Sequence, residues 1–449
     1  MSSKKLSRRQ FLVGCSSAIA AMAGARLTSL AFANPGESGA YNEDILVVVF
    51  LRGGWDALNV VMPISGEDRG HYEAARSELQ VPVSGEGAAI HLDNQFGMHP
   101  AMGPLYDLYT NKSLAIVQAV GLTSDTRSHF DAMQYIELGT PGQKSATTGW
   151  ITRHLESAPN LPPSILLPAL SAGNSQTMSL LGSYETVAMD SPGDFSFTGD
   201  WYYKDLQRAA LRNLYQGDSW LFQAGIQTLD AVDLIESANP GDYTPANGAV
   251  YPSGSFGSNL QTIAQMIKLD VGLRVATIDL GGWDTHEGQG DGSEGYLAGL
   301  LEDLAQGMAA LYTDLDTGGA SSYTSRMTLV MISEFGRRLR ENANHGTDHG
   351  HGSAMFVLGG QVNGGKVYGD WPGLKVEQLY DGADLAVSTD YRRVLSEILI
   401  SRLGNPNLDY VFPGYQGYQP MGLVRSIDEP PPILNQKIYL PGVMRQVES

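Results

Sequence analysis

Five short runs in this chain are almost wholly apolar and do not alternate between apolar and polar residues. They are ILVVVFL (residues 45–51), LAIVQAV (114–120), RVATIDL (274–280), TLVMIS (328–333) and AMFVLGG (354–360). A strand with one face in water alternates, whereas a strand covered on both faces is apolar at consecutive positions. The runs therefore predict strands of a mostly parallel sheet that helices cover on both sides.

Helical patterns lie between these runs. In residues 295–316, leucines and a methionine recur at spacings of three and four, which makes one apolar stripe along a helix. Residues 128–138, 259–269 and 390–403 are three further expected helices. This succession of strands and helices predicts an α/β fold, a three-layer α/β/α sandwich with a mostly parallel central sheet.

Residues 156–258 differ from the rest of the chain. Proline, glycine and serine interrupt weak strand patterns at 164–170 and 184–189, and residues 201–215 have a polar helical pattern. Residues 236–259 carry the proline, glycine and asparagine punctuation of a long loop. We expect this block to be an irregular insertion that covers one end of the sheet, within a single domain of residues 34–449.

The first 33 residues have the layout of an export signal. A basic start is followed by SRRQFL (residues 7–12), a weakly apolar stretch and the small-x-small sequence Ala-Phe-Ala at residues 31–33. The adjacent Arg8 and Arg9 resemble the twin-arginine signal, which directs the export of folded proteins. We therefore expect cleavage after residue 33, a periplasmic or secreted mature protein, and the twin-arginine export machinery as a partner.

Cys15 raises the alternative of lipidation, because LVGC (residues 12–15) looks like a lipobox. The apolar stretch that normally precedes a lipidated cysteine is missing, since Arg9 lies six residues upstream, so we expect no lipidation. Cys15 is the one cysteine of the chain. The mature protein therefore has no disulfide and depends on a large apolar core for its stability.

The charge of the mature chain excludes one class of partner. The full chain has 29 basic and 48 acidic residues, and residues 1–33 hold five basic residues and no acidic one. The mature chain thus has 24 basic against 48 acidic residues, a net charge of −24 with histidine neutral. Nucleic acid needs a basic face, so we expect no nucleic-acid partner. We also expect no membrane span in the mature chain, since no second apolar segment is long enough.

The tetrapeptide GGWD occurs twice, at residues 53–56 after the first apolar run and at residues 281–284 after the third. Nothing else repeats around the two copies, so two strand ends that reach one place explain it better than a duplication. In an open α/β sheet, ligands bind beyond the carboxyl ends of the strands, and glycines permit sharp turns there. Asp56 and Asp284 are therefore expected in the same cleft.

Histidines and carboxylates gather around the ends of the predicted strands. Imidazole and carboxylate groups together can bind Zn²⁺, Mn²⁺ or a similar ion. The candidate metal ligands are Asp56, His129, Asp284, His286, Glu334, Asp348, His349 and His351.

Each of these candidate site residues also has an interpretation that involves no metal or substrate. Asp56 after Gly-Gly-Trp can be a turn or cap residue, and GTDHGHG (residues 346–352) can be a solvated loop whose histidines bind nothing. Ser128 can simply cap a helix, and Arg337 with Arg338 can be a surface pair. Asp284 followed by His286 is the stronger signal, because the two side chains can turn toward one ion. Five such pieces at successive strand ends favour a common site.

Together these motifs resemble the DUF1501 family. The resemblance rests on the export signal and on FLRGGWDALNVVMP (residues 50–63), TRSHFDAMQYIELG (126–139), LGGWDTHEGQ (280–289), ISEFGR (332–337) and DHGHGSAMFVLGG (348–360). The family is similar in turn to the alkaline phosphatase and sulfatase superfamily. Its members have an α/β/α sandwich, two metal ions at the carboxyl edge of the sheet, and a Ser, Thr or formylglycine nucleophile at a helix start.

The resemblance assigns roles to residues of this chain. It implies that Asp56 is the carboxylate after the first strand and that Ser128 or a neighbouring hydroxyl is the nucleophile. It also implies that Asp284 and His286 are the Asp–His metal pair, and that His349 or His351 is the late metal-binding histidine.

This sequence departs from the superfamily pattern in several ways. Asp284 and His286 are two residues apart rather than four, and Ser-Asp-His-Gly has become Ser-Glu-Phe-Gly at residues 333–336. One imidazole ligand is thereby lost, and His129 or Asp348 replaces it, or the second ion is weak or absent. The sulfatase motif is missing and the mature chain has no cysteine, which excludes a formylglycine sulfatase.

These observations predict an exported metal-dependent hydrolase of a phosphate, sulfate or related anionic ester, with one or two Zn or Mn ions and no nucleotide cofactor. Ser128 is the expected nucleophile at a helix N-terminus, and Arg127 or Arg337 is expected to hold an oxygen of the small anionic substrate. One alternative is a non-catalytic metal- or ligand-binding or assembly protein on a degenerate hydrolase scaffold. Another is a metal-dependent mutase or isomerase of the same superfamily.

Overall fold

The computed structural model describes residues 41–426, apart from residues 162–164, 184, 195, 198–200, 218 and 238–242. The export signal expected at residues 1–33, with Cys15, lies outside the described residues. Parts of the weak strand patterns at 164–170 and 184–189 and of the expected loop at 236–259 also lie outside them.

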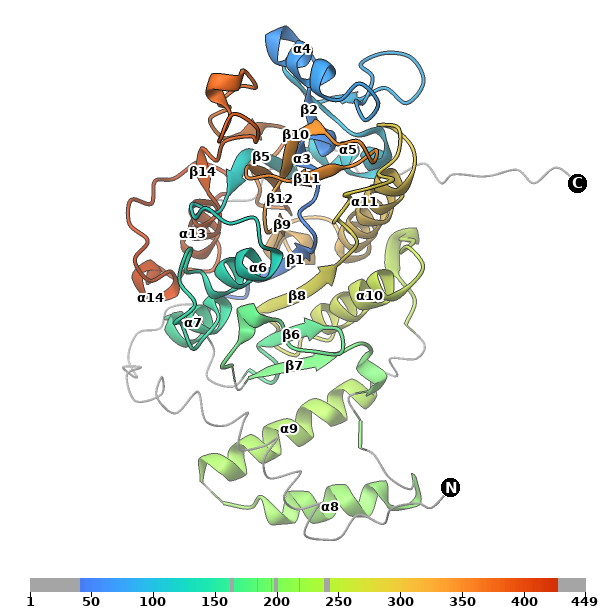
Figure 1. Cartoon of the computed structure of the whole chain (residues 1–449). Helices are drawn as coiled ribbons and strands as arrows, with labels where there is room; N and C mark the ends of the chain where they lie inside the picture. The colour runs from blue at the N-terminus through green and yellow to red at the C-terminus, as the bar shows by residue number, and fades with distance from the viewer. Residues whose placement is uncertain are drawn as a thin grey trace, which may run out of the picture.

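A nine-stranded sheet forms the middle of the molecule, with helices on both of its faces (Figure 1). Its strands lie in the order β13 (Val367–Tyr368), β5 (Leu114–Gly121), β12 (Ser353–Gly359), β9 (Met327–Ser333), β1 (Ile45–Leu51), β8 (Val275–Leu280), β6 (Ala169–Ala172) and β7 (Thr186–Met189), and β14 (Thr389–Asp390) also pairs with β5. β12 is antiparallel to β5 and β9, and the other pairs are parallel. The predicted three-layer sandwich with a mostly parallel sheet is confirmed.

Strand β1 shows why the apolar runs do not alternate. All seven of its residues are buried. Its odd-numbered residues (Ile45, Val47, Val49 and Leu51) join one hydrophobic core, and its even-numbered residues (Leu46, Val48 and Phe50) join another. Successive side chains of a strand point to opposite faces, so a strand with a core on each side must be apolar throughout.

Each core is closed by its own layer of helices. The first is covered by α5 (Gly103–Thr110), α10 (Ser255–Lys268) and α11 (Tyr296–Leu315). The second is covered by α6 (His129–Leu138), α7 (Trp150–Ser157), α13 (Tyr391–Ser401) and α14 (Leu408–Val411). No helix among the described residues is long and apolar enough to cross a membrane.

Smaller elements lie over the edge of the sheet at the top of Figure 1. They are α3 (Ala57–Val60), α4 (Gly66–Ala75), the small sheet of β2 (Val61–Pro63), β4 (Phe96–Met98) and β3 (Ile90–His91), and the hairpin of β10 (Arg337–Glu341) and β11 (Thr347–His349). Strand β12 runs opposite to its neighbours, so its start lies at the edge where β1, β8 and β9 end. The hairpin that joins β9 to β12 therefore stays at this edge.

The other elements are a short helix and several single turns. The short helix is α12 (Tyr323–Arg326), and the 3₁₀ turns are η1 (Pro100–Met102), η2 (Met178–Leu180), η3 (Pro192–Asp194), η4 (Trp201–Tyr203), η6 (Ala246–Gly248) and η7 (Val376–Gln378).

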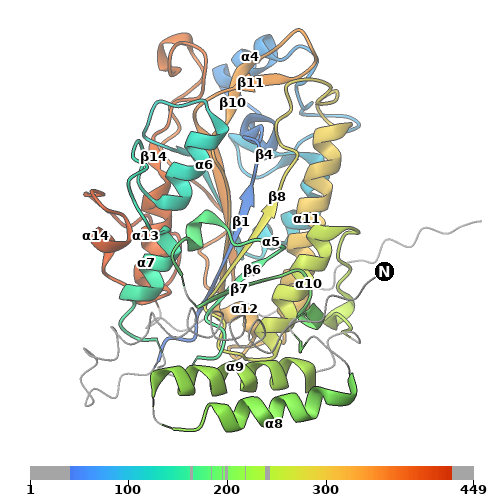
Figure 2. The same cartoon turned by 60° about the horizontal axis from the view of Figure 1, so that its bottom comes forward.

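The block at residues 156–258 is more regular than the sequence indicates. Strands β6 and β7 extend the central sheet beside β8, because the edge of β8 offers backbone groups that need hydrogen-bond partners. Helices α8 (Lys204–Leu214) and α9 (Trp220–Ser237) lie across the end of the molecule away from α4 (Figure 2). The block thus contributes both to the sheet and to a separate helical pair.

Candidate metal centre

The two GGWD turns lie side by side at the carboxyl edge of the sheet. Strands β1 and β8 are neighbours, with Leu51 beside Leu280. A Cβ atom on Gly53, whose φ is +129°, would lie 2.5 Å from the backbone nitrogen of Asp284. Trp55 and Trp283 pack edge to face with their ring centres 5.9 Å apart. The repeated tetrapeptide therefore reflects two adjacent strand ends that make closely packed turns.

The aspartates of the two turns have different surroundings. Asp56 is fully buried, and its two oxygens accept hydrogen bonds of 2.5 and 2.8 Å from Arg76, which is also fully buried. Gln289 donates a third hydrogen bond of 2.7 Å to Asp56. Asp284 has a half-exposed side chain and faces histidines instead. The structure does not bring Asp56, a predicted ligand, to the cluster that contains Asp284.

Three imidazole nitrogens converge on Asp284 Oδ1. The Nε2 atoms of His286 and His349 lie 3.2 Å from this oxygen, and that of His129 lies 3.3 Å from it. The Nε2 atom of His349 is also 2.8 Å from the Nε2 atoms of both His129 and His286. We call His129, Asp284, His286 and His349 the histidine cluster.

The other ring nitrogen of each histidine faces an oxygen. His129 Nδ1 lies 2.6 Å from Glu334 Oε1, His349 Nδ1 lies 2.8 Å from the carbonyl oxygen of Arg127, and His286 Nδ1 lies 3.3 Å from Asp348 Oδ1. A carbonyl or carboxylate oxygen only accepts hydrogen bonds, so these contacts assign the ring proton to Nδ1. In the neutral rings, the three Nε2 atoms then carry lone pairs.

Lone pairs that face one another at these distances repel unless a proton or a metal cation lies between them. The donor set of three imidazoles and one carboxylate suits Zn²⁺, and the oxygens on Nδ1 are the usual partners of histidines that bind a metal. Zn²⁺ bonds of about 2.0–2.1 Å in a tetrahedron place ligand atoms about 3.3 Å apart. The ligand atoms of His129, Asp284 and His349 lie 2.8–3.3 Å apart, close to this value, and all lie within 4.8 Å of one another, so these three residues fit a divalent ion, while His286 borders the group.

The charges in the cluster suit this role. Burial favours the neutral form of Asp284, but the hydrogen bond and charge of Arg337 outweigh it and hold the pKa of the carboxyl at about 2. Burial, and then the charge of His129, lowers the pKa of His349, so its ring is neutral near pH 7. His129 is different: burial disfavours its charged ring, but the hydrogen bond and charge of Glu334 raise its pKa above the ordinary value, so this ring would release a proton on binding an ion.

Arg337 joins the two GGWD turns. Its side chain is fully buried and donates to Gly54 O (2.6 Å), Gly53 O (2.5 Å), Thr347 O (2.8 Å) and Asp284 Oδ1 (2.6 Å). These bonds reach the first turn, strand β11 and a member of the cluster. Arg337 therefore fixes the turns and Asp284, rather than presenting its guanidinium to a substrate.

Glu334 also acts through another residue. Its carboxylate is fully buried and accepts hydrogen bonds from Gly53 N at 2.8 Å and Ser333 Oγ at 3.0 Å, besides its contact with His129. Asp348 contacts His286 and accepts from Asn342 Nδ2 at 3.1 Å. Both carboxylates thus orient histidines of the cluster.

The remaining predicted site residues lie beside the cluster. Ser128 is exposed at the N-cap of α6, and its Oγ accepts from the backbone nitrogen of Asp131 at 3.5 Å. The guanidinium of Arg127 is paired with Asp384 at 2.6 Å and Asp381 at 3.1 Å. His351 is buried and stacks on Tyr380 with ring centres 4.1 Å apart. His351 is therefore not placed with the three clustered histidines.

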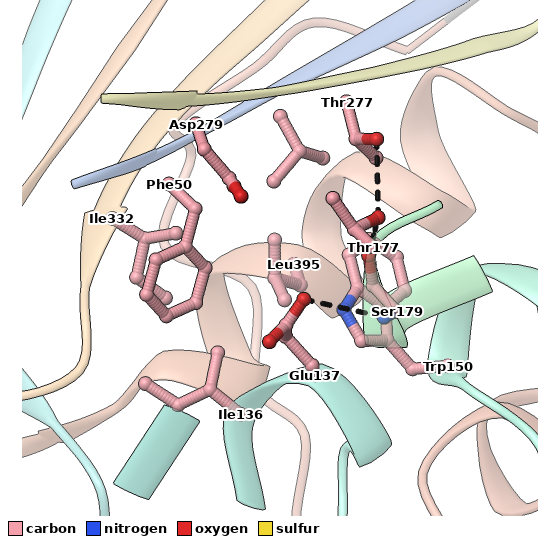
Figure 3. Close-up of a pocket in the computed structure, with 11 residues that line it drawn as sticks. Phe50, Ile136, Glu137, Trp150, Thr177, Ser179, Thr277, Asp279, Ile332 and Leu395 are labelled. Carbon is pink, nitrogen blue, oxygen red and sulfur yellow. Dashed lines mark hydrogen bonds between the residues drawn. The ribbon is translucent and has the colours of Figure 1, made fainter. Parts of the chain in front are cut away.

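A separate cavity lies between β1, β8 and β9 on one side and α6 and α7 on the other (Figure 3). Its volume is about 10 Å³, which is room for one water molecule. Glu137 and Asp279 line it, and both carboxylates pair with Arg52, at 3.2 and 2.6 Å. Since Arg52 directly precedes the first GGWD turn, this cavity belongs to the support of that turn and is too small for a substrate.

Several residues that build the site carry no local sequence signal. Arg76 ends α4, Gln289 lies five residues after Asp284, and Asn342 lies in the β10–β11 loop. Arg76 and Gln289 bind Asp56, and Asn342 donates to His286 O at 2.9 Å as well as to Asp348. Gln289 ends the motif LGGWDTHEGQ, but the motif does not show its role, because its partner Asp56 lies 233 residues away. The roles of Arg76 and Asn342 likewise depend on contacts between segments that are separate along the chain.

Residues 222–399 match the model of a family described as "Protein of unknown function (DUF1501)". This match confirms the resemblance to that family, and the matched part contains Asp284, His286 and His349. Asp56 and His129 lie before it. A comparison with curated proteins found no match.

Two solved structures were found to be similar to this chain. A protein in the alkaline phosphatase superfamily from Vibrio parahaemolyticus is 9% identical with a TM-score of 0.31, over 79% of this chain and 69% of that one. The lipoteichoic acid synthase LtaP from Listeria monocytogenes is 10% identical with a TM-score of 0.29, over 91% of this chain and 80% of that one.

Proposed function

We propose that this protein is an exported metal-dependent hydrolase of a phosphate, sulfate or related anionic ester. The observation that carries the proposal is the convergence of three Nε2 atoms on Asp284 Oδ1, with each Nδ1 atom held by an oxygen. His129, Asp284 and His349 would hold one divalent ion, of which Zn²⁺ best suits the nitrogen-rich set, and His286 lies beside them at 2.8 Å from His349 Nε2. Such an ion supplies a positive charge that polarises an anionic ester and favours ionisation of an attacking hydroxyl.

The protein's own residues provide the position for that chemistry. Asp284 is ionised at neutral pH because Arg337 holds its pKa at about 2, so the cluster carries a negative charge for the ion. Glu334, Asp348 and the carbonyl of Arg127 turn the three rings inward. Half-exposure of Asp284 and His286 leaves the cluster open to a small substrate.

Ser128 is the proposed nucleophile. It is exposed, directly precedes His129, and lies at the N-terminus of α6, where the helix dipole favours an oxyanion. A bond would form between Ser128 Oγ and the phosphorus or sulfur of the substrate while the bond to the leaving alcohol breaks. Water would then displace the serine, and the protons of the serine and of the alcohol would exchange with solvent.

Arg127 and Arg337 were expected to hold the substrate, but both guanidinium groups are already bonded to other residues. Arg127 is paired with two aspartates, and Arg337 is fully buried with backbone carbonyls and Asp284 around it. This observation favours the second candidate function, a non-catalytic metal-binding protein on a hydrolase scaffold. The two candidates share the metal centre and differ in turnover.

Metal content is the first test. We expect the purified exported protein to contain about one equivalent of Zn²⁺ or Mn²⁺. The variant Asp284→Asn should contain none. A protein without stoichiometric metal that also takes up none from added Zn²⁺ or Mn²⁺ would contradict both candidates. Mass spectrometry of the exported N-terminus tests cleavage after residue 33, and an uncleaved or lipidated N-terminus would contradict the export proposal.

Turnover separates the two candidates. The metal-loaded protein is tested against aryl phosphate monoesters, phosphate diesters and sulfate esters. We expect hydrolysis of one class, its loss in Ser128→Ala with metal retained, and no change in the control Thr123→Ala, which alters an exposed hydroxyl in the same loop. Bound metal without hydrolysis of any class would refute the hydrolase and leave the binding protein.

A further inference from the structure

Helices α8 and α9 form a pair at the end of the molecule opposite the hairpin of β10 and β11, which carries His349 (Figure 2). Leu211 and Tyr215, at the end of α8, pack with Leu229 of α9 in a small core of their own. The pair therefore has an inner side, where the two helices meet, and an outer side on α8.

The two arginines of α8 lie on its inner side, whereas Asp205 is exposed. Arg208 pairs with Asp233 at 2.8 Å and also with Glu236. Arg212 pairs with Asp230 and Asp233, both at 2.7 Å. The arginines of α8 are thus paired with the acidic residues of α9.

The outer side of α8 carries an apolar stripe, which the exposed Asn213 borders. Tyr203 is 51% exposed, Leu206 is 64% exposed and Leu214 is 51% exposed, and Ala210 between them is exposed as well. Their spacing of three, four and four residues places them in one stripe along the helix. A surface helix normally turns such a stripe toward the core. In α8 the arginines face α9 instead, and the apolar stripe faces outward. Within the described part of the chain, nothing buries this stripe.

We propose that a second copy of this chain covers the stripe, with α8 antiparallel to α8 of the second copy and a two-fold axis near Ala210. Leu206 and Leu214 lie four residues on either side of Ala210. Such an arrangement is self-complementary, because Leu206 of each copy then meets Leu214 of the other. Ala210 is small enough for the two helices to approach closely at the axis.

The charges favour a second copy over a lipid surface. Helices that lie on anionic membranes present free basic residues, whereas Arg208 and Arg212 are already paired here. The exposed Asp205 does not oppose a two-fold pair. The Asp205 side chain of the second copy would lie roughly 15 Å away along the helix axis, since each residue adds about 1.5 Å. This separation is longer than the Debye length of about 8 Å at physiological ionic strength, so salt screens most of the repulsion.

The interface would be small. Stable dimers bury about 800 Å² on each partner, more than one face of an 11-residue helix provides. We therefore expect a reversible dimer that depends on protein concentration.

Cross-linking tests the register. The chain has one cysteine, Cys15, so Ala210→Cys in a Cys15→Ser background is the sole thiol. A residue on a two-fold axis faces itself, and we expect rapid disulfide-linked dimer under mild oxidation. The control Val376→Cys changes a residue that is 66% exposed elsewhere and should remain monomeric. Equal or slower cross-linking at residue 210 than at the control would overturn the proposal.

Sedimentation velocity over a range of concentrations tests the stripe. We expect Leu206→Glu to raise the dissociation constant of the dimer at least tenfold with an unchanged circular dichroism spectrum, and Val376→Glu to leave it unchanged. A wild-type protein that stays monomeric at all concentrations would overturn the proposal. So would binding of the monomer to phosphatidylcholine–phosphatidylglycerol vesicles that Leu206→Glu abolishes, since the stripe would then cover a lipid surface.

Discussion

The paired substitutions Asp56→Asn and Asp284→Asn test whether the two GGWD aspartates have the separate roles that their contacts indicate. Asp56 and Arg76 are both fully buried and bonded to each other. Asp284 is half-exposed and faces three histidines. We expect Asp56→Asn to lower the stability of the fold while metal binding is retained. We expect Asp284→Asn to abolish metal binding and to lower the stability of the metal-free fold by less than Asp56→Asn, because Asp284 is half-exposed although its partner Arg337 is buried.

The sizes of the two effects follow from burial. Removal of one partner from a buried ion pair costs about 3–5 kcal/mol, because the charge of Arg76 is left without compensation. An unfolding entropy of about 2.1 cal/mol/K per residue gives roughly 0.9 kcal/mol/K for a chain of this size, so Tm should fall by about 3–6 °C. A metal present at 100 times its Kd adds about 2.7 kcal/mol, or about 3 °C by the same conversion.

Thermal unfolding is measured with excess Zn²⁺ and with chelator, for the wild type and both variants. The Zn²⁺-dependent increase in Tm should persist in Asp56→Asn and vanish in Asp284→Asn. Metal analysis of each dialysed protein gives the stoichiometry independently. If Asp56→Asn lost the metal and kept the stability of the metal-free wild type, Asp56 would be a ligand and the assignment from burial would be refuted.

Three further predictions concern the backbone, a buried histidine and Arg337. Gly53→Ala should destabilise the fold by about 1–3 kcal/mol, since its φ is +129° and the new Cβ would lie 2.5 Å from the neighbouring turn. The control Gly281→Ala has open space around the new Cβ, so its free energy of unfolding in urea should differ from that of the wild type by no more than about 0.5 kcal/mol. Burial lowers the pKa of His154 to about 4, so the folded state binds fewer protons than the unfolded state between that value and about 6.5. The contribution of this neutral ring to stability is complete above pH 6.5 and falls by about 3 kcal/mol in total as the pH drops toward 4. In His154→Gln, the free energy of unfolding should therefore depend less on pH between 6.5 and 4. A slope equal to that of the wild type would contradict this prediction. In Arg337→Lys, one ammonium group cannot replace the guanidinium, which donates hydrogen bonds to both turns. We expect metal affinity, measured by chelator competition, to fall about 10- to 100-fold while the circular dichroism spectrum is unchanged. An affinity equal to that of the wild type would refute the role given to Arg337.

The sequence determined the main features of the fold. Continuous apolar runs are a property of strands with a core on each face, and β1 has such a core on each side. The periodic leucines likewise predicted α11, because helix periodicity is local. The block at residues 156–258 was harder to predict, since β6 and β7 are short and owe their place to pairing with β8.

The sequence also indicated where the site lies. Chain order and strand direction place Asp284, His286 and the residues around His349 at one edge of the sheet, and the apolar runs alone suffice to find that edge. His129 was among the candidates for the same reason. The outward face of α8 was not predictable, because its polar pattern does not say which side α9 covers.

Tertiary structure decided which of the candidate groups are available. Asp56 and Asp284 end the same four letters, yet a buried carboxylate needs a charged partner, and Arg76 reaches only the first. Glu334, Asp348 and the carbonyl of Arg127 fix the histidines from three separate segments. Sequence gives the kinds of groups at a sheet edge, but which lone pairs remain free depends on partners that are distant along the chain.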